Sequence, residues 1–237
     1  MAQHEDKTLS FLTHLDELRA RLIRAFLAVV ACSVIFYFYV DNFLGLLIKP
    51  VGRLIYTSPA DAFVARLILT LLGGFILALP FVFYETWKFV KIGLTPQENR
   101  HVRVFGPLSF GCFILGAVFA YFIMIPISLQ FLLSFSSPAI IPMIMIDKYI
   151  AFVGTLILAC GVIFEVPLVL MFLTKIGIAT PAFLIQKRKY AIVIILVMSA
   201  LLTPPDVATQ LLLAAPLLLL YEVGVVLSKW VYRGPDL

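Results

Sequence analysis

Residues 104–146 read VFGPLSFGCFILGAVFAYFIMIPISLQFLLSFSSPAIIPMIMI, and this stretch contains no charged side chain. As a single helix it would be about 64 Å long, which is roughly twice the hydrocarbon thickness of a bilayer. The stretch must therefore hold one membrane span and a further segment. Pro107 suits the first turn of a helix, and the serines and prolines at 134–142 indicate a turn. We expect a span at 105–135.

The whole chain is unusually apolar. Of its 237 residues, 62% are hydrophobic and 13% are charged, whereas soluble domains are about 45–50% apolar and about 25% charged. A water-soluble fold of this size could not bury so much apolar surface. The net charge of +5 does not indicate a nucleic-acid partner, because the basic residues lie in short segments beside apolar runs. The three cysteines lie inside apolar runs, without the spacing of a metal or redox site.

Further apolar runs complete an all-α, polytopic membrane protein. We expect one membrane domain over residues 1–237 with spans at 23–40, 67–84, 105–135, 149–174, 190–202 and 207–227. Residues 1–22 are polar and then amphipathic, and we expect them to lie along the membrane surface and lead into the first span. They lack the features of a cleavable signal peptide. The last two runs are short for the roughly 20 residues that a span needs, so we expect two stunted spans.

The distribution of lysine and arginine predicts the orientation of these spans. The amino-terminal segment, the tail and the loops at 85–103 and 175–189 hold 14 of the 18 basic residues. Cytoplasmic loops are enriched in lysine and arginine. Both termini and these two loops should therefore face the cytoplasm.

One carboxylate lies well inside an apolar run. Glu165 is about ten residues from the cytoplasmic end of the fourth span, and Pro167 follows it. A charge at that depth costs at least about 2.5 kcal/mol, and a proline kinks the helix by removing a backbone donor. Two interpretations stay open. Glu165 lines a polar indentation that water or a partner reaches, or it is a neutral acid bonded to a neighbouring helix.

The other acidic residues have plain structural explanations on composition alone. Glu85 and Glu222 lie near span ends and fit an interfacial role, and Glu17 and Glu98 lie beside arginines and fit solvated ion pairs. Asp206 follows two prolines and fits a helix N-cap. The chain contains no P-loop, nucleophile elbow or zinc-protease motif. An enzyme, a metal centre and a bound cofactor are therefore not expected.

Five blocks of sequence, in order along the chain, resemble the TatC family, the multispanning receptor subunits of the twin-arginine protein translocase. They are LTHLDELRARL at 12–22, WKFVKIGLTPQE at 87–98, FEVP at 164–167, LTPPD at 202–206 and YEVG at 221–224. Residues 91–93 depart from the family, which commonly has a proline there. The loop glutamate nevertheless stays in register. Because the blocks cover most of the chain, the resemblance is specific.

The resemblance implies a glove-like bundle of six helices whose concave face binds signal peptides with paired arginines. It assigns signal-peptide binding to Glu17, Arg19, Phe89 and Glu98. The chemistry is suitable, because a guanidinium pairs bidentately with a carboxylate. An aromatic ring can also pack against a guanidinium or an apolar part of the peptide.

The resemblance also implies partners. Single-span TatA- and TatB-type subunits would pack against the last two spans and the concave face, within a larger self-associating complex driven by the proton motive force in a prokaryotic plasma membrane. Glu165 and Pro167 would form an intramembrane partner site. Partner contacts and the turn between the last two spans fall on Pro204, Pro205, Asp206, Gln210 and Glu222. The rival hypotheses are a proton-coupled small-solute transporter that uses Glu165 and a structural membrane scaffold.

Overall fold

The computed structural model describes residues 2–52, 54–94, 99–136, 142–202 and 207–232, with the backbone alone for 2–14, 93, 99–103 and 208. Its elements over these ranges are helices, and a single backbone bridge joins Ile55 to Met145. The predicted all-α class is therefore confirmed. The chain divides into two compact units, Met1–Leu47 with Arg66–Phe110, and Ile48–Ala65 with Gly111–Leu237.

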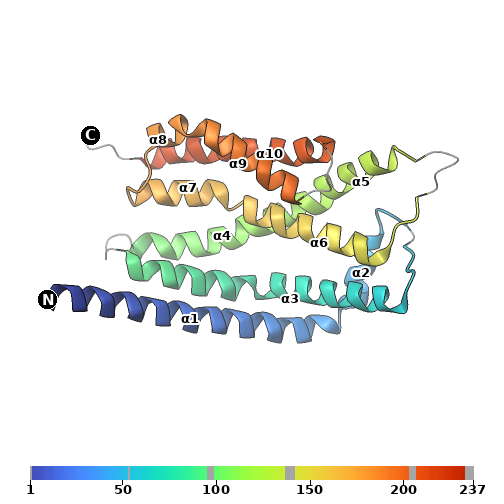
Figure 1. The fold of residues 1–237 in the computed structure, drawn as a ribbon, viewed down its shortest axis with the longest axis horizontal. Coiled ribbons are helices and arrows are strands. Elements are labelled where there is room, and N and C mark those ends of the chain that lie inside the picture. The colour runs from blue at the N-terminus through green and yellow to red at the C-terminus, as the bar shows by residue number, and fades with distance from the viewer. Residues whose placement is uncertain (1, 53, 95–98, 137–141, 203–206, 233–237) are drawn as a thin grey trace. The chain divides into compact units, whose positions relative to one another are not determined.

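The first unit is built on α1 (Ala2–Tyr37) and most of α3 (Pro59–Val90), which lie side by side (Figure 1). Two glycines permit this close approach. A Cβ at Gly73 would collide with the Phe36 ring, and one at Gly74 would collide with Ser33. The unit also holds most of α2 (Val40–Ile48), η1 (Lys91–Gly93) and the start of α4 (Asn99–Phe119).

The separate surface segment predicted for residues 1–22 is not a separate element. Helix α1 runs unbroken through that boundary. The physical reason is visible in the sequence, because residues 2–37 contain no glycine or proline to end the helix. The amphipathic start and the apolar run are one rod.

The second unit begins in α4 and continues through η2 (Ala120–Met124), a π-helical turn, into α5 (Ile125–Leu133). It goes on through α6 (Ile146–Ile163), α7 (Val166–Lys175), α8 (Pro181–Gln186), α9 (Arg188–Leu202) and α10 (Val207–Val231). Helix α10 packs along α7 and α9 (Figure 1). Two buried hydroxyls, those of Thr174 and Ser228, lie 2.9 Å apart between α7 and α10.

Five stretches of the described helices are long and apolar enough to cross a membrane. They are Leu15–Tyr37, Pro59–Val90, Val104–Leu133, Ile146–Lys175 and Thr209–Val231. Helix α9, which holds the predicted fifth span, has 15 residues and is about 22 Å long. The prediction of a stunted sixth span is wrong, because α10 has 25 residues. The predicted span ends at residue 227, just before the polar or interfacial residues Ser228, Lys229 and Trp230. The helix continues through all three.

The fourth span is two helices rather than one. Helix α6 ends at Ile163 and α7 begins at Val166, with a turn at Phe164 and Glu165. Pro167 stands in the first turn of α7, where its missing N–H removes a donor that a continuous helix would need. The interruption therefore lies where the proline predicts a kink.

Candidate functional site

A network of four charged side chains, two of them buried, joins α1 to α3 in the first unit. Glu85 on α3 is 5% exposed and Arg21 on α1 is 6% exposed. Arg21 Nη1 lies 3.2 Å from Glu85 Oε2, and Arg24 Nη2 lies 3.3 Å from the same oxygen. Arg21 Nη2 also lies 2.5 Å from Glu17 Oε1. We call Glu17, Arg21, Arg24 and Glu85 the α1–α3 charge network.

The network is electrically balanced, with two guanidinium groups and two carboxylates. This balance matters because an unpaired buried charge costs several kcal/mol. The sequence interpretation of Glu85 as a plain interfacial residue is therefore wrong, since its carboxylate is buried against two arginines. A usable signal was present in α1, where positions 17, 21 and 24 follow the spacing of a single helix face.

The structure describes three of the four predicted signal-peptide residues, and they lie at different points of the first unit. The Glu17 side chain is 41% exposed while it holds Arg21. Arg19 is exposed but lies two positions further along α1, on another face of the helix. Phe89 is partly buried and follows Glu85 by about one helical turn, on the same side of α3. Glu98 lies outside the described residues.

In the second unit, Glu165 and Pro167 lie at the break between α6 and α7. Glu165 is partly buried and Pro167 is buried. Helix α10 passes close to this break, because a Cβ built on Gly224 would lie 3.0 Å from the Cα of Pro167. The Phe164 ring packs against the Phe119 ring with centroids 5.3 Å apart. The Glu165 carboxylate therefore lies at a helix break and not on the face of a continuous helix.

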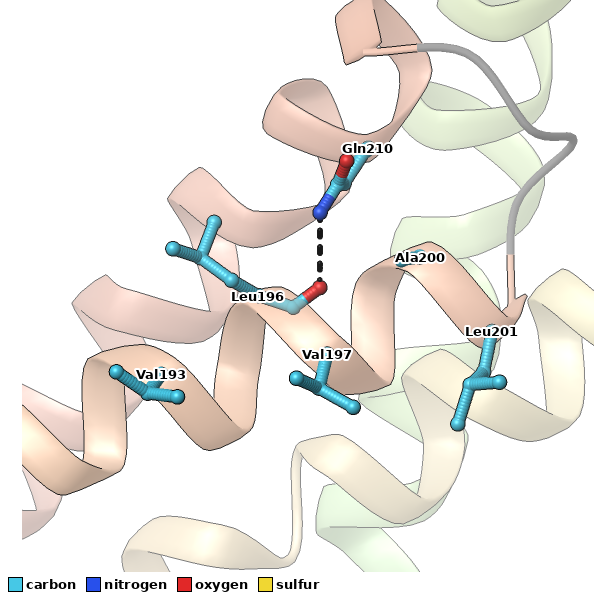
Figure 2. A pocket seen from close by; sticks show the side chains of 6 residues that line it. All are labelled: Val193, Leu196, Val197, Ala200, Leu201 and Gln210. Carbon is cyan, nitrogen blue, oxygen red and sulfur yellow. Dashed lines mark hydrogen bonds between the residues drawn. The ribbon is translucent and has the colours of Figure 1, made fainter.

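Gln210 lies at an apolar pocket between α9 and α10 (Figure 2). Its Nε2 donates a hydrogen bond of 3.0 Å to the Leu196 carbonyl. The cavity has a volume of about 310 Å³ and is lined by Val193, Leu196, Val197, Ala200, Leu201 and Gln210. A pocket with an apolar lining and one amide is suited to an apolar helix that carries a polar group.

Glu222 does not share this pocket. It lies twelve residues after Gln210 on α10, about 18 Å along the helix. Its carboxylate accepts a 2.6 Å hydrogen bond from Arg188, and both side chains are about half exposed. Pro204, Pro205 and Asp206 lie outside the described residues. The structure therefore separates Gln210 from Glu222.

The comparisons with known proteins agree on one family. The family model described as Sec-independent protein translocase protein (TatC) matches residues 13–216. A TatC protein of Carboxydothermus hydrogenoformans is 39% identical over 232 residues, covering 96% of each chain. One from Aquifex aeolicus is 40% identical over 231 residues, covering 93% of this chain and 95% of the relative.

A solved structure leads to the same family. The crystal structure of a twin arginine translocase receptor, TatC, superposes with a TM-score of 0.85 at 39% identity, covering 93% of this chain and 100% of that chain. These similarities do not support the small-solute transporter that the sequence left open, since the relatives are named as protein translocase components. The chain is a multipass helical membrane protein and belongs to the TatC family of Sec-independent protein translocase proteins.

Proposed function

We propose that this chain is the receptor and core subunit of a translocase that binds twin-arginine signal peptides of folded proteins. The solved relative is titled a twin arginine translocase receptor. The observation that carries the proposal is the half-exposed Glu17 carboxylate, held at one oxygen by the buried Arg21. A peptide guanidinium pairs well with a carboxylate whose position is already fixed, because less side-chain freedom is lost on binding.

The α1–α3 charge network determines where the Glu17 carboxylate lies. Arg21 is held between Glu17 and Glu85, and Glu85 is also paired with Arg24. Arg21 therefore cannot turn away from α3 without leaving Glu85 short of a partner. Glu17 supplies the first carboxylate of the receptor, and we assign the second to Glu98, which would bind the other arginine of the pair.

Phe89 and Arg19 extend this binding surface. Phe89 shares a side of α3 with Glu85, and its ring would pack against the apolar residue or guanidinium next to the bound arginine. Arg19 lies on a different face of α1 from Glu17. We assign it to carbonyl groups of the peptide, because its own charge repels the paired arginines.

We further propose that the second unit binds single-span partner helices of the TatA and TatB type. The pocket at Gln210 offers an apolar cavity with one amide, and the helix break at Glu165 offers a carboxylate at membrane depth. Helix α9, about 22 Å long, would thin the bilayer locally. The bias of basic residues supports cytoplasmic termini. Following the family, we place this single membrane domain in a prokaryotic plasma membrane, where the proton motive force would drive export.

A precursor pull-down tests this proposal. Detergent-purified protein should retain a twin-arginine precursor, and Glu17→Gln combined with Glu98→Gln should abolish retention. Asp16→Asn is the matched control, since it removes one exposed acidic charge from the neighbouring position. Retention that is unchanged in the double variant would refute the site assignment.

A further inference from the structure

A second cavity lies in the first unit, between the end of α3 and the start of α4. It has a volume of about 510 Å³ and is lined by Pro80, Tyr84, Trp87, Lys88, Lys91, Gly106, Pro107 and Phe110. The α3 positions fall on one helix face, since they are separated by three or four residues. This face differs from the one that carries Glu85, so the cavity is distinct from the α1–α3 charge network. Its size falls within the range of ligand pockets.

The walls of this cavity are held in place by packing. Trp87 Nε1 donates a 3.0 Å hydrogen bond to the hydroxyl of Ser109, which is 1% exposed. The Trp87 ring also packs on the Phe105 ring, with centroids 5.6 Å apart. Gly106 leaves space beside this indole, because a Cβ there would lie 3.7 Å from Trp87. These contacts fix the position of the Trp87 indole in the cavity wall.

The cavity lies near the ends of two candidate membrane spans. The α3 residues lie in the last turns of the candidate span Pro59–Val90, and the α4 residues lie in the first turns of Val104–Leu133. Tyrosine and tryptophan concentrate at this level of membrane proteins. An occupant would thus have one end in hydrocarbon and the other in the polar interface.

Two cations stand at the rim. Lys88 and Lys91 are exposed, and Lys88 Nζ lies 5.5 Å above the Tyr84 ring. Within the described residues, neither lysine forms an ion pair with a carboxylate. Lys88 lies in the last turn of α3 and Lys91 begins η1, and both line the same cavity. Two cations at one cavity can bind a single phosphate group.

We propose that this cavity binds an anionic phospholipid, with an acyl chain against the aromatic and proline walls and the phosphate between Lys88 and Lys91. The apolar lining favours a lipid over a free phosphate, and the cationic rim favours an anionic headgroup over a zwitterionic one. The inference is independent of the signal-peptide proposal, because it uses another face of α3.

Fluorescence quenching tests it. The chain has two tryptophans, and Trp230 is 82% exposed, so Trp230→Phe leaves Trp87 as the sole reporter in an otherwise intact protein. Phosphatidylglycerol with brominated acyl chains should quench Trp87 in detergent micelles at an about tenfold lower mole fraction than phosphatidylcholine with the same chains. Equal quenching by the two lipids would overturn the proposal.

Variants identify the groups responsible. Lys88→Gln with Lys91→Gln should remove the preference for phosphatidylglycerol, and Lys88→Arg with Lys91→Arg should keep it. Gly106→Leu should fill the cavity and reduce quenching by both lipids. The matched control is Lys187→Gln with Lys189→Gln, which removes two exposed lysines beside aromatic rings elsewhere in the chain. Loss of preference in this control would show a general charge effect and contradict the assignment.

Competition distinguishes other occupants. Unbrominated phosphatidylglycerol should reverse the quenching, and inorganic phosphate should not. Reversal by phosphate, or by a twin-arginine signal peptide at stoichiometric concentration, would overturn the lipid assignment. Because Glu17→Gln should leave lipid quenching unchanged, failure of this inference is distinguishable from failure of the receptor proposal.

Discussion

The Arg21 guanidinium lies 3.2 Å from the Glu85 carboxylate, and this pair joins α1 to α3 while nearly excluded from solvent. A buried ion pair contributes little net stability, but breaking it leaves one charge without its partner. Here the arginine that the pair holds also contacts Glu17. The contact between α1 and α3 thus fixes the position of the Glu17 carboxylate, to which we assign signal-peptide binding.

Glu85→Ala should destabilise the protein by about 3–5 kcal/mol, because it removes the buried carboxylate that pairs with the buried Arg21. The measurement is thermal unfolding in detergent. Arg24→Gln serves as the control and should cost about 1 kcal/mol or less, since that side chain is 47% exposed. An equal loss in both variants would contradict the buried network.

Replacing both members of the pair should behave differently. Arg21→Met combined with Glu85→Leu should recover most of the stability that Glu85→Ala loses, because no buried charge remains unpaired. The same double variant should bind twin-arginine peptide more weakly, since Glu17 has lost its anchor. Wild-type affinity in a stably folded double variant would show that Arg21 does not position Glu17.

The close approach of α1 and α3 predicts a sharp difference between two glycines. Gly74→Ala should cost about 1–3 kcal/mol, because the new methyl group would collide with Ser33. Gly45→Ala, on helix α2, meets nothing within 4 Å and should be neutral or stabilising by about 0.5–1 kcal/mol. Thermal unfolding of the two variants side by side checks this, and equal melting temperatures would contradict the packing.

Gln210→Leu should weaken partner binding without unfolding the protein. The hydrogen bond to the Leu196 carbonyl contributes about 1 kcal/mol to the stability of the fold. A partner helix, in contrast, would lose the amide group that it contacts in the pocket. Co-purification of single-span subunits should fall several-fold. Glu222→Gln is the control outside the pocket and should retain the partners. Equal co-purification of wild-type protein and Gln210→Leu would remove Gln210 from the interface.

Much of this fold follows from local sequence. The apolar runs predict the helices, and Pro167 predicts the break beside Glu165. The wrong predictions concern helix ends, which we predict where the chain changes from apolar to polar or the reverse. Helix α1 passes the boundary at 22 and α10 continues past 227, because a polar residue costs a helix only a few tenths of a kcal/mol.

The charge network was beyond local reasoning for a different physical reason. Arg21 and Glu85 are 64 residues apart, and no spacing rule relates residues on different helices. Only the packing of α1 on α3 brings them together. The cavity at Lys88 and Lys91 likewise depends on how α4 returns beside α3. The family resemblance predicts a binding role for Glu17, but it does not predict the contact with Arg21 that positions its carboxylate.

The most direct test of the central claim is a double-mutant cycle between receptor and peptide. A labelled twin-arginine peptide and its Arg→Gln variants would be titrated against wild-type protein, Glu17→Gln and the control Asp16→Asn. We predict that Glu17→Gln weakens the parent peptide at least about tenfold, equivalent to about 1.4 kcal/mol. Glu17→Gln should hardly weaken binding of one Arg→Gln peptide, namely the peptide that lacks the arginine bound by Glu17, because that contact is already lost. Additive losses for both peptide variants would contradict a contact between Glu17 and the arginine pair.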